Sequence, residues 1–133
     1  MNTKLQDIDH IHVFVPNCQG ALDWYSNILG LRPVEKLLSW AKSGPLMVGN
    51  DDGTIHIALF ERDPKNNQSI VAFKTGEKEF LDIHKKVSNY LNRAVKIVDH
   101  DISFSFYFDD PYGNPYEITS YDHKALSNHY NKP

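Results

Sequence analysis

Two residue types able to bind metal ions or move protons occur inside stretches whose pattern predicts strands. His10 and His12 alternate with apolar residues between Ile8 and Val15, so His10, His12 and Phe14 should share one face of a strand. Glu117 lies within the last predicted strand, where an acidic residue is unusual. Neutral imidazole and carboxylate suit Fe, Mn, Co, Ni or Zn, and such a metal can act as a Lewis acid. A solvent-facing glutamate is the alternative for Glu117 taken alone.

Glu117 belongs to a predicted hairpin that spans residues 103–121. Aromatic and β-branched residues lie on both sides of a turn containing Gly113, which accepts the positive φ that tight turns often need. Alternation along the second strand puts Glu117, Thr119 and Tyr121 on one face. The carboxylate is therefore predicted to stand on a strand beside polar and aromatic neighbours.

Periodicity and turn residues predict the other elements of the first half. Asn17 and Gly30 are typical helix caps and bound a helix of about three turns. Weaker patterns predict strands at 32–41 and 46–49, and a clear alternation predicts a strand at 54–61. In the last of these, His56 lies on the face opposite the apolar one formed by Ile57 and Leu59.

The second half repeats the same order of elements after a polar connector at 62–68. Its predicted elements are a strand at 69–74, a helix at 77–91, a strand at 95–98 and the hairpin, whereas the tail at 122–133 has no reliable periodicity. Two βαβββ modules, about 7–64 and 68–121, are thus expected within a single domain of α+β class. Each sheet would pack its helix on one face and leave the other to curve around a cleft.

Composition limits the classes of function. The 133 residues fit one domain; 14 Lys and Arg stand against 17 Asp and Glu, and no basic run suggests nucleic acid or an anionic membrane as a partner. The single Cys18 cannot form an intrachain disulfide and is expected to be structural. Without an apolar run of about 20 residues or a signal-peptide pattern, a cytoplasmic location is predicted. Serine-hydrolase elbows, phosphate-binding glycine loops and Cys-x-x-Cys pairs are absent from the sequence.

Two segments carry a resemblance to a known family. Ile-Asp-His-Ile at 8–11, followed by Trp-Tyr-Ser-Asn-Ile-Leu-Gly-Leu at 24–31, resembles the opening of the vicinal oxygen chelate superfamily. Asp-Pro-Tyr-Gly-Asn-Pro-Tyr-Glu-Ile at 110–118 is similar to its second hallmark. The superfamily includes glyoxalase I, bleomycin and fosfomycin resistance proteins and extradiol dioxygenases. The resemblance covers nearly the whole chain and implies paired βαβββ modules, a divalent metal in the cleft and commonly a homodimer.

The resemblance also implies a set of metal ligands. His10 matches the first-strand histidine and Glu117 the last-strand glutamate of metal-binding members. Another histidine usually opens the second module, where this chain has Ile70. A further ligand commonly comes from the last strand of the first module, and alternation favours His56 over Glu61 there.

Other residues are expected to line the cleft and bind substrate. His12 is next to His10 on the same face, with a hydrogen-bonded core histidine as the alternative. Aromatic residues of the strands are further candidates, although strand aromatics are usually core residues: Phe14, Trp40, Tyr107 and Tyr121. His100, just before the hairpin, is expected either beside the cleft or in solvent.

Two functions remain open. The first is a small metal-dependent enzyme, of lyase, isomerase, thiol-transferase or dioxygenase type, that binds a small substrate through vicinal oxygens. Ring-cleaving dioxygenation is disfavoured within it, because the second histidine of that iron site is missing from its expected place. The alternative is a metal-free protein that sequesters a small molecule or drug in an aromatic cleft.

Overall fold

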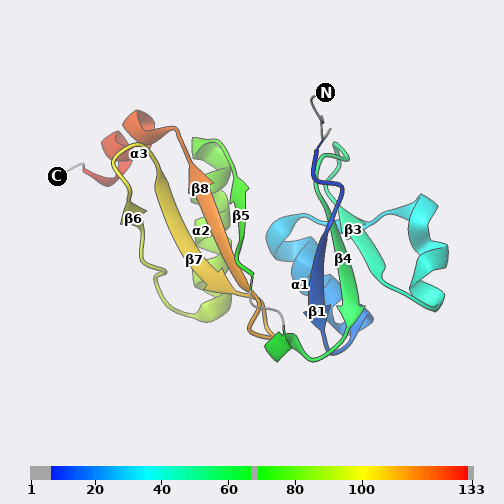
Figure 1. Cartoon of the computed structure of the whole chain (residues 1–133). Helices are drawn as coiled ribbons and strands as arrows, with labels where there is room; N and C mark the ends of the chain where they lie inside the picture. Colours follow the sequence, from blue (N-terminus) through cyan, green and yellow to red (C-terminus); the bar gives the residue numbers. More distant parts are fainter. Residues whose placement is uncertain (1–6, 67–68, 132–133) are drawn as a thin grey trace, which may run out of the picture. The chain divides into compact units, whose positions relative to one another are not determined.

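The computed structural model describes residues 7–66 and 69–131. The chain divides into two compact units, Met1–Asn67 and Gln68–Pro133. Each unit contains a four-stranded sheet, and Figure 1 shows a long helix beside each sheet. Unit 1 contains, in chain order, β1 (Ile11–Val15), α1 (Cys18–Leu29), β2 (Arg32–Pro33), the 3-10 helix η1 (Glu35–Lys42), β3 (Leu46–Gly49), β4 (His56–Glu61) and the short 3-10 helix η2 (Pro64–Asn66).

The sheet of unit 1 has the strand order β1-β4-β3-β2. β1 pairs in parallel with β4, and the other pairs are antiparallel. Apolar residues at alternate positions of β1 and β4 are buried together with residues of α1: Val13, Val15, Ile57, Leu59, Ala21 and Tyr25. The helix therefore covers one face of this sheet, and the alternate side chains stand on the other.

The predicted caps of α1 are confirmed. The side chain of Asn17 accepts a hydrogen bond from the Gly20 amide at 2.7 Å. Gly30 has φ of 67° and donates its amide to the Ser26 carbonyl. Only a residue without a Cβ adopts this left-handed conformation at little cost, so glycine ends the helix here.

The strand predicted at 32–41 is wrong beyond Pro33. The chain pairs with β3 only at Arg32–Pro33 and then winds into η1, which buries none of its residues. Trp40 is half exposed at 50% and does not line a core. Leu37 and Leu38 are consecutive rather than alternating, so the segment lacks the period of two that would fix one face of a strand against a core.

Unit 2 repeats the topology of unit 1. Its elements are β5 (Val71–Lys74), α2 (Glu77–Leu91), β6 (Val98–Asp99), β7 (Phe104–Asp109), β8 (Pro115–Ser120) and α3 (His123–Tyr130). The sheet order is β5-β8-β7-β6, with β5 and β8 parallel. Phe80 of α2 packs edge-on against Phe106 of β7 at 5.0 Å between ring centroids. The α+β class and the twice-repeated βαβββ order are thus confirmed.

The predicted hairpin is confirmed as β7 and β8. Gly113 has φ of 89°, which allows the tight turn between them. The buried Asp110 accepts hydrogen bonds from the amides of Tyr112 and Asn114 at 2.8 and 2.9 Å. A satisfied carboxylate inside the turn holds the two strands in the register that pairs Tyr107 with Glu117.

The polar tail forms a helix that the sequence did not predict. Leu126 of α3 is fully buried, and the ring of His123 stacks on Phe104 at 4.7 Å. His123 Nε2 also lies 2.7 Å from Asp99 Oδ1. Asp122, just before α3, accepts a hydrogen bond from the Glu77 amide at the start of α2. Contacts to the rest of unit 2, rather than an apolar stripe of its own, hold this helix in place.

Two smaller observations complete the fold. The strand predicted at 95–98 is shorter and later than expected, because only Val98–Asp99 pairs with β7. Across residues 7–66 and 69–131, none of the helices has both the length and the apolar character of a membrane-spanning segment.

Candidate functional site

The face of the first sheet opposite α1 carries the predicted histidines. The register pairs His12 with Ala58 and Phe14 with Phe60, as the alternation of β1 and β4 predicted. Continuing the same parallel register one pair upstream brings His10 level with His56. Unit 1 therefore presents imidazoles and aromatic rings on the face opposite α1.

His10 is held between a carboxylate and a second imidazole. Its Nδ1 lies 2.7 Å from Asp9 Oδ2, and its Nε2 lies 3.0 Å from Nε2 of His12. The hydrogen bond from His10 lowers the pKa of Asp9 below its ordinary value. His12 is exposed, so the core position considered for it is wrong. Asp9 was not predicted as a site residue; its position directly before His10 was the available signal.

His56 makes a different contact from the other two histidines. It is partly buried and pairs with Gly49 of β3. A Cβ added to Gly49 would lie 2.9 Å from His56 Cδ2 and from the Ile55 carbonyl oxygen. The imidazole thus packs against the neighbouring strand where that strand has no side chain.

An aromatic cluster lies beside the histidines. The ring of His12 is 4.6 Å from that of Phe60, and Phe14 meets Phe60 edge-on at 6.5 Å. The Arg62 guanidinium carbon lies 5.2 Å from the Phe60 centroid and 5.9 Å from that of Phe14. Arg62 was not predicted, because it falls just after β4 in the polar connector. This cluster joins a cation, two rings and an imidazole on one face.

The uncovered face of the second sheet carries Glu117. This residue is partly buried, and its Oε2 accepts a hydrogen bond from the buried Ser105 hydroxyl at 2.9 Å. Thr119 Oγ1 lies 3.1 Å from the same hydroxyl. Glu117 is therefore not the solvent-facing glutamate of the alternative interpretation. Ser105 was missed, although its cross-strand register with Thr119 makes it a neighbour of Glu117.

Tyr107 is the cross-strand partner of Glu117. Its side chain is 42% exposed, and His100 Nε2 lies 3.2 Å from its hydroxyl. Partial desolvation, and then the negative charge of Glu117, raise the pKa of Tyr107 above its ordinary value. Tyr121 follows the end of β8 and is 61% exposed. The structure thus brings Tyr107, rather than Tyr121, into the neighbourhood of Glu117.

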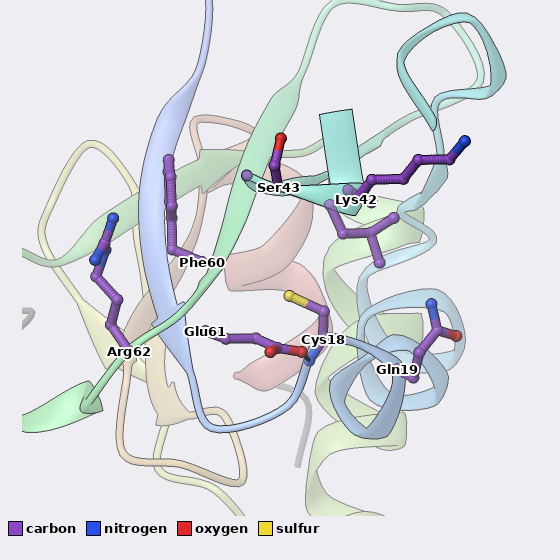
Figure 2. Close-up of a pocket in the computed structure, with 10 residues that line it drawn as sticks. Cys18, Gln19, Lys42, Ser43, Phe60, Glu61 and Arg62 are labelled. Atoms are coloured by element: carbon purple, nitrogen blue, oxygen red, sulfur yellow. Dashed lines mark hydrogen bonds between the residues drawn. The ribbon is translucent and has the colours of Figure 1, made fainter. Parts of the chain in front are cut away.

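A cavity of about 470 Å³ lies at the N-terminal end of α1, and Phe60 and Arg62 of the aromatic cluster are among the residues that line it, together with Cys18 and Glu61 (Figure 2). Glu61 Oε1 accepts the Cys18 amide at 3.1 Å, and the Cys18 thiol donates to the Leu59 carbonyl. Burial raises the pKa of the Cys18 thiol, consistent with its expected structural role. Figure 2 shows Glu61 turned toward Cys18 while Arg62 lies on the other side of the strand. Alternation had separated Glu61 from the His56 face in the same way.

The donor atoms fit a divalent transition metal by type, but they are divided between the units. Unit 1 supplies the imidazoles and unit 2 the Glu117 carboxylate. Within either unit, no three His, Cys, Asp or Glu side chains of residues 7–66 and 69–131 are grouped to hold a metal. Ile70, where the resemblance implies a histidine, is 59% exposed just before β5. Alternation puts it on the face of Ala72, the partner of Glu117.

Known structures share this fold. No curated protein sequence matches the chain. A Bacillus anthracis protein named for the glyoxalase family is 20% identical, with a TM-score of 0.70 over 91% of this chain and 99% of that one. A glyoxalase/dioxygenase from Nostoc punctiforme is 21% identical, with a TM-score of 0.63 over 90% and 97%. A glyoxylase/bleomycin resistance protein/dioxygenase domain from Frankia sp. EAN1pec is 12% identical, with a TM-score of 0.67 over 96% and 100%.

These structural similarities show the fold alone, and a match to a family model shows the family. The model of the Glyoxalase/Bleomycin resistance protein/Dioxygenase superfamily matches residues 7–118. This span contains β1 with its histidines at one end and Glu117 of β8 at the other. The chain therefore belongs to the Glyoxalase/Bleomycin resistance protein/Dioxygenase superfamily.

Proposed function

We propose that this protein is a small metal-dependent enzyme that binds a small substrate through two neighbouring oxygen atoms. His10 and Glu117 are the metal ligands, with His56 as the further imidazole that the family pattern suggests. The contact between Asp9 and His10 carries the proposal. A carboxylate that accepts from one ring nitrogen fixes the tautomer and leaves the other nitrogen unprotonated, with a lone pair that can bind a metal. A histidine with no role beyond being a surface residue would not need a carboxylate that fixes its tautomer.

The proposed roles follow from what each side chain can do. A divalent metal such as Zn, Ni, Mn, Co or Fe would supply Lewis acidity toward oxygen atoms of the substrate. Ser105 holds the Glu117 carboxylate in place through a hydrogen bond of 2.9 Å. Glu117 is also the residue proposed to accept a proton from the substrate, since Ser105 holds its carboxylate in place. These roles fit lyase, isomerase, thiol-transferase or dioxygenase chemistry.

Substrate contacts are proposed for the side chains beside these ligands. Phe14 and His12 flank Phe60 in unit 1, and Tyr107 and Tyr121 extend the aromatic surface in unit 2. Tyr107 is the strongest of the four, because its hydroxyl contacts His100 and its ring lies beside Glu117. A flat or apolar substrate would find stacking partners among these rings.

A metal-free binding protein is the second candidate. The Arg62 guanidinium over Phe60 and Phe14 favours it, because this cluster can hold a ligand by stacking and by charge without any metal. In that case His10 and Glu117 would be polar contacts for the ligand. The two functions differ in one measurable property, the binding of a divalent ion.

A homodimer and a cytoplasmic location complete the proposal. Members of this superfamily bind small molecules and are often dimeric. The only cysteine, Cys18, is buried and has no partner for a disulfide within the chain. That pattern suits a reducing compartment.

Calorimetry with Zn²⁺, Ni²⁺, Mn²⁺ and Fe²⁺ tests the metal ligands. We expect the wild type to bind at least one of these ions tightly, and His10→Ala and Glu117→Gln each to abolish tight binding with the fold retained. Binding should also weaken below about pH 6, because protons compete for imidazole ligands. His129→Ala is the matched control, since this histidine is exposed on α3 and should bind as the wild type does.

Ile70→His provides the reciprocal test. Its side chain should share the face of Glu117, and we expect it to strengthen metal binding. If the wild type binds none of the four ions and Ile70→His creates binding, the chain has lost its metal site. We would then conclude that the protein is a metal-free binding protein and not a metal-dependent enzyme.

A further inference from the structure

We infer that His12 is the second imidazole ligand of unit 1, so that His10, just before β1, and His12 within it form a two-histidine chelate. The inference rests on the proposed metal function and changes which residues serve it. It gives His12 a place in the metal site in place of a contact with substrate. His56 is left with a packing role against β3.

The separation of the two imidazoles supports the chelate. Nε2 of His10 and Nε2 of His12 are 3.0 Å apart. Two nitrogens that bind one metal at about 2.1 Å are about 3.0 Å apart at the 90° angle of an octahedral site and about 3.4 Å apart at the angle of a tetrahedral one. A cation can thus replace the hydrogen bond between the rings with little movement of either nitrogen.

The surroundings of each ring fix its position. Asp9 accepts from Nδ1 of His10, which is the contact that metal-binding histidines usually make with their other nitrogen. His12 rests on Phe60 at 4.6 Å between centroids. His12 is exposed, so an ion and its remaining ligands have room beside it. Both imidazoles are therefore oriented before any ion binds.

The hydrogen bonds also define the proton arrangement. Because Nδ1 of His10 donates to Asp9, a neutral His10 has an unprotonated Nε2. Nε2 of His12 must then carry the proton that joins the two rings. For His12 to bind a metal through Nε2, that proton must leave Nε2 while a proton from solvent occupies Nδ1. The ring stays neutral, and no net proton is released.

His56 lacks these features. It is level with His10 in the sheet, but its Cδ2 packs where a Gly49 side chain would stand. Reaching an ion between His10 and His12 would require it to leave that packing position.

Matched variants separate the two histidines. Calorimetric titration of Ni²⁺ and Zn²⁺ into the wild type, His12→Ala and His56→Ala should show at least about 100-fold weaker binding for His12→Ala. His56→Ala should stay within about threefold of the wild type. Circular dichroism should show both variants folded, since His12 is exposed and the ring of His56 can be removed without opening the core.

Nitrogen-15 spectra of the imidazoles give a second readout on the wild type. His12 should change from the Nε2–H to the Nδ1–H form when Zn²⁺ is added, while His10 keeps its proton on Nδ1. Wild-type affinity in His12→Ala, or an unchanged His12 tautomer in the Zn²⁺-bound protein, would overturn the inference alone. If the wild type binds neither ion, the proposed metal function fails and the chelate fails with it.

Discussion

Cys18 illustrates how its surroundings decide the chemistry of a single residue. A thiol at the start of a helix is often reactive, because the helix dipole favours the thiolate. Here the side chain is 8% exposed, its Sγ donates to the Leu59 carbonyl, and Glu61 already accepts the helix-terminal amide. Burial raises its pKa, so the thiol stays protonated at a higher pH than an exposed thiol does.

Cys18 should therefore react slowly with a disulfide reagent such as Ellman's reagent at pH 8 in the native protein. In denaturant it should react at the rate of a free thiol, because burial and the raised pKa are both lost. Glu61→Gln, which removes a negative charge near the thiol, should speed the native reaction only modestly. Rapid native labelling would show that Cys18 is open to the cavity beside α1.

Residues of the candidate site were predictable where alternation alone decides their position. The face shared by His10, His12 and Phe14 follows from period two and is found in the structure. Contacts made by side chains were not predictable in the same way. Ser105 reaches Glu117 because the hairpin register puts Ser105 opposite Thr119, two residues along β8 from Glu117. That register depends on the turn, which a pattern of hydrophobic residues does not fix.

A hydrogen bond between the start of α2 and the residue before α3 attaches α3 to the rest of unit 2. Asp122 lies at the start of α3, but its side chain accepts the Glu77 amide at 2.8 Å, at the start of α2. One carboxylate thereby satisfies a free helix amide and ties the tail to the second helix. Negative charge at this end of α2 is also favourable to its dipole.

Asp122→Ala should lower the free energy of unfolding by about 1 kcal/mol, as loss of a helix cap usually does. Urea denaturation followed by circular dichroism measures this change. Lys124→Ala is the matched control, because Lys124 is exposed two residues later in the same helix. Equal stability of Asp122→Ala and the control would mean that the contact to Glu77 contributes nothing.

Elements were predictable in proportion to how strongly their own residues specify them. α2 spans 77–91 as predicted, because apolar residues recur along it at helical spacing. The tail lacks such a stripe, and it becomes helical through Leu126, His123 and Asp122, which all find partners elsewhere in unit 2. The segment of η1 was misassigned for a related reason, since it buries nothing that would fix its geometry.

At the scale of the whole molecule, the edge strands of the two sheets are relevant to the oligomeric state. β1 and β5 each lie at an edge of their own sheet, and β2 and β6 at the opposite edges are two residues long. Short edge strands are protected, whereas longer ones invite pairing unless they are covered. A symmetric dimer is a common way to cover such edges.

Light scattering should therefore give a mass of about 31 kDa at micromolar concentration, which is twice the chain mass of 15.3 kDa. The mass should not change between 10 and 100 micromolar if the dimer is stable. A mass near that of one chain over this range would contradict the proposed homodimer.

We propose that this member of the superfamily binds a divalent metal, which is a property of the intact protein. Elemental analysis of protein purified without an affinity tag or chelator tests it most directly, because the result does not depend on knowing the substrate. We predict about one equivalent of a transition metal per chain, lost in His10→Ala and in Glu117→Gln. Protein that contains no such metal, and takes up none when Zn²⁺, Ni²⁺, Mn²⁺ or Fe²⁺ is supplied, would contradict the claim.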